Sequence, residues 1–309
     1  MANPEISVDA LLPPEMAARA EAIGIRKAAM PFLSMFELSV LAGAFIGAGA
    51  FFSTTVTAGM SGVVPFGLIR LLAGGAFCLG LIMVVVAGAE LFTGNNLIVM
   101  AWADRKVRTS QLLRNWGVVW VGNLVGAVLT ALIIFAGKQY TFGGGSVGLN
   151  ALATANAKTS LEFVQAIALG ILCNALVCIA VWLCYSARST TDKILSIIFP
   201  ISAFVACGFE HSVANMYFIP IGLLIKNYAP PSFWEAIHKT PADFPTLTLS
   251  NFFVRNLLPV TIGNIIGGAV MVGLVYWFAY LRPKSSSAPA APAAGGADES
   301  VRINPRPSR

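Results

Sequence analysis

Three ionisable side chains lie inside stretches that are otherwise apolar enough to enter a bilayer: Glu90, Glu210 and His211. Each costs several kcal/mol at membrane depth, so such residues are functional candidates by default. Histidine is the side chain whose ordinary pKa places its charge change between about pH 5 and 8. A single buried histidine is more often a satisfied core residue, but His211 lies beside an expected helix break inside the membrane, so we expect it to be functional.

The two glutamates belong to a pattern that occurs twice, Gly-x-Glu followed five residues later by Asn, with Asn95 and Asn215 at its ends. A second duplicated pattern has Arg-Asn, then Gly-Asn and Gly at identical spacing: Arg114, Asn115, Gly122, Asn123 and Gly126, then Arg255, Asn256, Gly263, Asn264 and Gly267. We expect a structural role for both glutamates, through backbone N–H groups or through Arg114 and Arg255. A direct role in transport is the alternative. Asn123 and Asn264 are expected to bond across helices, with a role as polar pore lining as the alternative.

Both copies of the first pattern place glycine and polar residues in the middle of long apolar segments. Such a run predicts an interrupted helix, and non-helical backbone at membrane depth must be buried in protein or line a watery cavity. Matching interruptions in two repeated halves point to a permeation site near the bilayer midplane.

Composition places the chain in a membrane, with 57% hydrophobic residues, 11% charged residues and a mean hydropathy of +0.76. Apolar stretches of about 20 residues or more are long enough to cross a bilayer. Six such regions are present, three in each half: 31–58, 71–103, 116–136, 164–185, 194–225 and 257–281. The sequence therefore predicts an all-α membrane protein with six spans.

Lysine and arginine gather at the N-terminal flank, in the loops near residues 105 and 190, and after residue 281. These flanks fall on one side of a six-span chain, which the positive-inside rule assigns to the cytoplasm. Both termini are then cytoplasmic, and three spans per half make the halves an inverted repeat. The same flanks account for the formal charge of +6, and nothing in the sequence indicates a nucleic-acid partner.

Three regions follow from this pattern. Residues 1–28 lack a secretory signal and are expected to carry a short cytoplasmic or interfacial helix within 10–25, on the membrane surface or against a neighbouring subunit. Residues 29–283 form the transmembrane domain. Residues 284–309, rich in Ala, Pro, Ser and Gly, are expected to be a disordered cytoplasmic tail.

Enzyme classes receive no support from the sequence. The five cysteines lie in or beside apolar spans without a CxxC pair, which is typical of packing thiols, and neither a metal site nor a cofactor is expected. An intramembrane redox subunit remains as an alternative, but it needs several His or Cys ligands at helical spacing. The small-xxx-small glycine pairs, Gly43 with Gly47 among them, indicate close helix packing.

Three stretches together resemble the formate–nitrite transporter family: AGAELFTGN (87–95), CGFEHSVANMYFIPIG (207–222) and RNLLPVTIGNIIGGAV (255–270). The similarity extends from about residue 10 to residue 282 and is strongest to the bacterial formate channels. It implies an aquaporin-like fold of six helices with the second and fifth broken. It also implies a homopentamer in the bacterial inner membrane with one pore per subunit.

The resemblance also implies residue roles. His211 corresponds to the family's central histidine and Thr93 to its partner, while Asn174 and Lys158 correspond to the pore asparagine and the vestibule lysine. Apolar pore constrictions fall on Phe77, Leu81, Leu91, Phe92 and Phe204. Without the resemblance, Lys158 is an ordinary loop lysine and the five apolar residues are core.

The cargo implied is formate and similar small monovalent anions, with protons as a second partner. Nitrite, hydrosulfide, acetate and lactate on the same scaffold are the alternatives. An anion loses favourable hydration in an apolar passage, so His211 either stabilises it as a cation or gives it a proton. The sequence leaves open whether the chain is a passive channel or a proton symporter.

Overall fold

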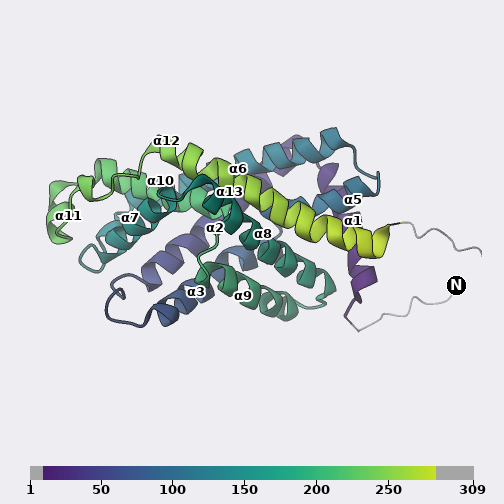
Figure 1. The fold of residues 1–309 in the computed structure, drawn as a ribbon, viewed down its shortest axis with the longest axis horizontal. Helices are drawn as coiled ribbons and strands as arrows, with labels where there is room; N and C mark the ends of the chain where they lie inside the picture. The colour runs from purple at the N-terminus through teal and green to yellow at the C-terminus, as the bar shows by residue number, and fades with distance from the viewer. Residues whose placement is uncertain (1–9, 283–309) are drawn as a thin grey trace, which may run out of the picture.

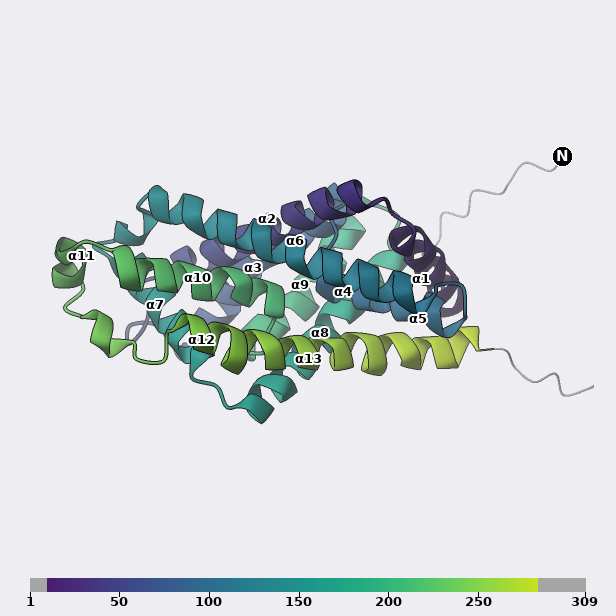
Figure 2. The same ribbon diagram turned by 90° about the horizontal axis from the view of Figure 1, so that it is seen from above.

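The computed structural model describes residues 10–282, and every regular element in that range is helical. Long helices run side by side along the longest axis of the molecule (Figure 1). The same arrangement is seen from above (Figure 2). The described residues therefore have an all-helical architecture. The expected tail, 284–309, lies outside the described residues.

Five continuous helices in residues 10–282 are long and apolar enough to cross a membrane. They are α2 (Phe32–Val56), α3 (Phe66–Ala87), α6 (Thr109–Ala136), α8 (Phe163–Ser186) and the stretch Leu249–Leu281. That last stretch comprises α12 (Leu249–Asn251), η4 (Phe252–Leu257), α13 (Leu258–Ile265), η5 (Ile266–Leu274) and η6 (Trp277–Leu281). Many large apolar side chains on these helices are exposed, among them Ile133 and Val164. Exposed apolar flanks suit a protein surrounded by lipid or by further subunits.

Two of the six apolar regions are interrupted. After α3 the chain is non-helical to Leu91, then continues through α4 (Phe92–Asn95), η1 (Asn96–Ile98) and α5 (Val99–Ala103). After α9 (Thr190–Ala206) it is non-helical to His211, and α10 (Ser212–Tyr228) follows. Gly88 and Gly208 take φ of 85° and 75° at these points. Glycine adopts this left-handed conformation without a steric penalty, so the duplicated glycines permit both turns.

Helix α1 (Pro13–Ala28) overlaps the region expected to be helical, 10–25, extends beyond its end, and contacts other helices of its own chain. Met16, Ala17 and Ala20 pack with Met100 and Trp182 in a small buried cluster. The start of α1 and the end of η6 therefore lie at the same end of the molecule, beside α5 (Figure 2).

The sequence pattern did not predict α7 (Ser146–Thr159) or the short helix α11 (Pro231–Ala236), both in the connections at the opposite end. α7 packs on α10. Helix α7 is too short and too mixed in polarity to be recognised as a span by hydropathy, yet it carries Lys158 in its last turn. Its packing on α10 brings Lys158 to the second interruption.

Glycine lets the long helices approach closely. A Cβ atom at Gly126 of α6 would overlap the carbonyl oxygen of Val40 in α2, and one at Gly267 would overlap that of Ile171 in α8. The interpretation that these glycines serve close helix packing is confirmed.

Candidate functional site

Two cavities open from opposite ends of the helix bundle. The larger, of about 460 Å³, is lined by Arg70, Phe77, Lys158, Phe204 and His211 among others. The smaller, of about 270 Å³, lies at the end that carries α1, and Lys27, Leu81, Glu90, Leu91 and Lys193 contribute to its wall. The backbone interruptions line these cavities, as expected for non-helical backbone at membrane depth.

The two interruptions meet at a contact between His211 and Thr93, whose Nε2 and Oγ1 atoms lie 3.0 Å apart. Both side chains are buried. His211 is the N-cap of α10, and its Nδ1 accepts the N–H of Ala214 at 3.0 Å. A backbone N–H is only a donor, so Nδ1 carries no proton here and neutral His211 is protonated at Nε2. That N–H donates to Thr93 Oγ1, and the threonine O–H remains free to donate to a solute.

Aromatic rings surround this contact on the side of the larger cavity. The Phe204 ring lies 5.9 Å from the His211 ring and meets Phe77 edge-on at 5.6 Å, measured between centroids. Leu81 and Leu91 line the smaller cavity. Phe77 and Phe204 thus line the larger cavity, and Leu81 and Leu91 line the smaller one.

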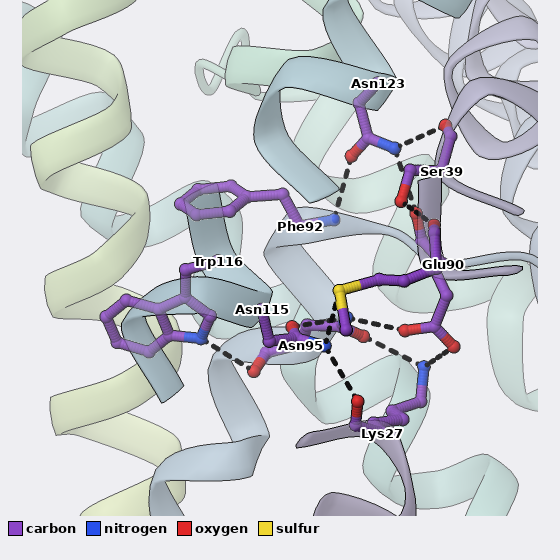
Figure 3. Close-up of polar contacts among 9 residues, drawn as sticks. Lys27, Ser39, Glu90, Phe92, Asn95, Asn115, Trp116 and Asn123 are labelled. Carbon is purple, nitrogen blue, oxygen red and sulfur yellow. Dashed lines mark hydrogen bonds and ion pairs between the residues drawn. The ribbon is translucent and has the colours of Figure 1, made fainter. Parts of the chain in front are cut away.

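Phe92 is placed differently. Its ring meets Trp116 edge-on at 6.4 Å and lines neither of these two cavities, while its N–H donates to Asn123 Oδ1 at 2.9 Å (Figure 3). Asn174 is fully buried and also lines neither cavity. Its Nδ2 contacts the Thr93 carbonyl at 3.3 Å and Asn96 Oδ1 at 2.8 Å, which fixes the backbone of α4.

A polar cluster of four residues, here called the first tetrad, holds the first interruption: Lys27, Glu90, Asn95 and Asn115 (Figure 3). Lys27 Nζ donates to Glu90 Oε1 at 2.8 Å, and Asn95 Nδ2 donates to Glu90 Oε2 at 2.7 Å. Asn95 also donates to Asn115 Oδ1 at 2.9 Å, and Asn115 donates to the Lys27 carbonyl at 3.1 Å. Each polar group in this ring is satisfied by another, as a buried polar network requires.

The second tetrad repeats this ring at the other interruption, with Lys158, Glu210, Asn215 and Asn256. Lys158 Nζ donates to Glu210 Oε1 at 2.8 Å, and Asn215 Nδ2 donates to Glu210 Oε2 at 2.7 Å. Asn215 donates to Asn256 Oδ1 at 2.7 Å, and Asn256 donates to the Lys158 carbonyl at 2.9 Å. The duplicated Glu and Asn residues, each with a lysine, thus build the same four hydrogen bonds twice. One difference between the two tetrads lies at an asparagine oxygen: Asn95 Oδ1 accepts from Lys27, whereas Asn215 Oδ1 has no hydrogen-bond partner among the described residues.

Asn123 and Asn264 form hydrogen bonds both to the interruptions and to neighbouring helices. Asn123 Nδ2 donates to the carbonyls of Ser39 and Glu90 at 2.8 and 2.9 Å. Asn264 Nδ2 donates to the Gly170 and Glu210 carbonyls at the same distances. The prediction that these asparagines bond across helices is confirmed.

The two partners expected for the glutamates were backbone N–H groups or Arg114 and Arg255, and both expectations are wrong: lysine and asparagine side chains donate to the two carboxylates. Glu90 and Glu210 bind lysines, and Arg114 instead donates to the Met30 carbonyl at 3.2 Å. Sequence reasoning missed Lys27 entirely. A usable signal was present: Lys27 and Lys158 each stand five residues before the first residue of a long helix, Phe32 and Phe163 respectively.

Cys78, Cys173, Cys178 and Cys184 are buried, in agreement with packing thiols, whereas Cys207 is exposed. Within residues 10–282, no group of three or more His, Cys, Asp or Glu is arranged to hold a metal ion.

Residues 14–278 match the family model described as "Formate/nitrite transporter". The chain belongs to the formate/nitrite transporter family. It is 48% identical to the formate channel FocA of Escherichia coli strain K12 over 274 residues, which cover 89% of this chain and 96% of that protein. It is 44% identical to FocA of Haemophilus influenzae, covering 88% and 95% of the two chains.

A solved structure described as a pentameric formate channel with formate bound is similar in fold, with a TM-score of 0.78. Its sequence is 47% identical, and the match covers 81% of this chain and 98% of that one. These relatives are named as channels rather than enzymes.

Proposed function

We propose that this protein is a membrane channel that passes formate and similar small monovalent anions through a pore inside each protomer. The observation that carries the proposal is the His211–Thr93 contact, where two backbone interruptions meet between cavities from opposite ends. The cargo is taken from the relatives, whose names and bound ligand specify formate.

The proposed architecture has six spans in an inverted 3+3 repeat of aquaporin-like form. Its second span is α3 with α4, η1 and α5, and its fifth is α9 with α10. The equivalent tetrads support the repeat. The shared location of α1 and η6 supports placing both termini in the cytoplasm of a bacterium, under its inner membrane (Figure 1). Assembly as a homopentamer is proposed from the similar pentameric channel.

The domain boundaries carry over as proposals. The first 28 residues supply α1, which covers one end of the bundle. Residues 29–283 form the channel in the lipid bilayer. The role of 284–309 as a tail rests on composition alone.

The passage selects by dehydration and replacement of hydrogen bonds. An anion between Phe77, Phe204 and Leu91 loses hydration that apolar side chains cannot replace. His211 Nε2–H donates to Thr93 Oγ1, and the Thr93 O–H in turn donates one hydrogen bond to the anion, while the histidine stays neutral. For His211 to carry a second proton on Nδ1, it must first release the N–H of Ala214. Proton-coupled passage in this mechanism therefore requires the imidazole to break its N-cap hydrogen bond with the Ala214 N–H.

Widening the passage tests this assignment. Phe204→Ala and Leu91→Ala remove side chains that border the two cavities, so leak of acetate or chloride is expected to rise about tenfold or more. This estimate takes desolvation as the barrier and each large side chain as worth about 1.5–3 kcal/mol. Anion flux into proteoliposomes is the measurement.

Phe92→Ala serves as the comparison in the same assay. If Phe92 is part of the constriction, its removal raises the same leak. If it packs on Trp116 alone, selectivity is unchanged and only thermal stability falls. Unchanged selectivity in all three variants would contradict a constriction built from these rings.

A further inference from the structure

Each tetrad lysine is paired with a glutamate, so the pair adds no net charge to the cavity that it lines. Lys158 Nζ lies 2.8 Å from Glu210 Oε1, and Lys27 Nζ lies 2.8 Å from Glu90 Oε1. All four side chains are buried or partly buried, so solvent does not separate the partners. Such a pair presents a dipole, and its attraction for an approaching anion falls off more steeply with distance than that of a single charge.

Among residues 10–282, the lining of the larger cavity contains one further charged residue, Arg70 of α3. Its Nε donates to the carbonyl of Ala206 at 3.0 Å, and a terminal nitrogen donates to that of Val205. These carbonyls belong to the last turn of α9, directly before the second interruption. Carbonyl oxygens carry no net charge, so this cavity keeps one uncompensated positive charge, held in place by its hydrogen bonds.

The smaller cavity has the corresponding feature. In the described part of the chain, its charged lining residues are Arg19, Lys27, Glu90 and Lys193. Arg19 is exposed and donates to the Tyr185 carbonyl at 3.0 Å. Lys193 is partly buried in α9 and forms no ion pair among residues 10–282, while its neighbour Asp192 accepts the Ser189 N–H at 2.9 Å. Here too, positive charge is in excess after Lys27 and Glu90 cancel.

We propose that Arg70 at one pore mouth and Lys193 at the other are the cations that draw the substrate anion in, while the tetrad lysines hold the interruptions. The arrangement is crossed: Arg70 of the first half caps the helix before the second interruption, and Lys193 of the second half lines the cavity at the first. This inference deepens the proposed function and rests on it. A fixed positive charge in a low-dielectric mouth raises the local concentration of anions.

The test is initial formate uptake by proteoliposomes of the full chain, at ionic strengths of about 0.01 M and about 1 M set with potassium gluconate. The Debye length falls from about 30 Å to about 3 Å between these conditions. Arg70→Gln is expected to lower uptake about fivefold at low ionic strength and much less at high ionic strength. Lys193→Gln is expected to act in the same way from the other mouth.

Two controls separate charge from structure. Arg70→Lys keeps the charge but cannot reproduce the two-armed cap, so it is expected to retain most of the uptake and its salt dependence. Lys239→Gln removes an equal, exposed charge in the loop after α11, outside both cavities, and is expected to behave as the wild type.

An Arg70→Gln variant with wild-type uptake at both ionic strengths overturns the inference. The inference is also overturned if Arg70→Lys lowers formate uptake as much as Arg70→Gln does. The role of Arg70 would then be to cap the end of α9, and not to supply charge. If Arg70→Gln fails to fold, Arg70→Lys and Lys193→Gln still decide the question. A wild-type chain that passes no formate contradicts the proposed function itself, and this inference with it.

Discussion

Glu210→Gln is expected to destabilise the folded protein by about 3–5 kcal/mol, the cost of leaving one partner of a buried ion pair alone. Glutamine keeps the size of the side chain and can still accept from Asn215. It cannot neutralise Lys158, whose side chain is 15% exposed and has Glu210 as its ion-pair partner. The midpoint of unfolding in detergent and the yield of assembled protein measure the loss, and formate flux should fall with them.

The double variant Lys158→Met, Glu210→Gln is the informative companion. It removes both charges, so much of the lost stability should return. Glu235→Gln, on the exposed face of α11, is a matched control with no expected effect. Glu90→Gln should lower the stability less than Glu210→Gln. Lys27 is 25% exposed, and it still donates a hydrogen bond to Asn95 Oδ1 at 2.9 Å. Wild-type stability of Glu210→Gln, with no gain in the double variant, would contradict the structural role of the second tetrad.

His211→Phe is expected to remove the pH dependence of formate current, leaving either a constant current or none. Formate resembles ordinary carboxyls with a pKa near about 3.5–4, so the anion concentration is nearly constant between about pH 5 and 8. Any change of current in this range therefore comes from the protein. If His211 passes a proton to the anion, wild-type current should fall as the pH is lowered, because anion and proton then cross together without net charge.

His211→Asn separates hydrogen bonding from titration. Asparagine is a favourable N-cap and can accept the Ala214 N–H, so α10 should remain intact. It cannot take up a proton in this range, and its current should be independent of pH. Current recorded across planar bilayers is the measurement. A wild-type pH profile in both folded, pentameric variants would assign His211 to capping and hydrogen bonding alone.

Much of this site could be predicted because it repeats. The duplicated Gly-x-Glu patterns mark both interruptions, since a glycine at positive φ is required where each helix ends. The cross-helix role of Asn123 and Asn264 was also predictable, because a buried amide beside packing glycines has backbone carbonyls of the next helix within reach.

What the sequence did not reveal depends on long-range geometry. Lys27 and Glu90 are 63 residues apart, and only the packing of α1 against the helix bundle brings them together. α7 has neither the length nor the apolar content of a span, so hydropathy cannot distinguish it from a loop. The direction of the Phe92 ring depends on rotamer and neighbours, which spacing along a broken helix does not determine.

Uptake of formate by proteoliposomes of the purified wild-type chain, with and without a pH gradient, tests the central claim most directly. Nitrite, hydrosulfide, acetate and lactate are measured in parallel. Formate should enter far faster than in protein-free liposomes and faster than lactate, and an inward proton gradient should accelerate it if passage is proton-coupled. Faster uptake of nitrite or hydrosulfide than of formate would reassign the cargo on the same scaffold. Uptake of all these anions at the protein-free rate would contradict the channel itself.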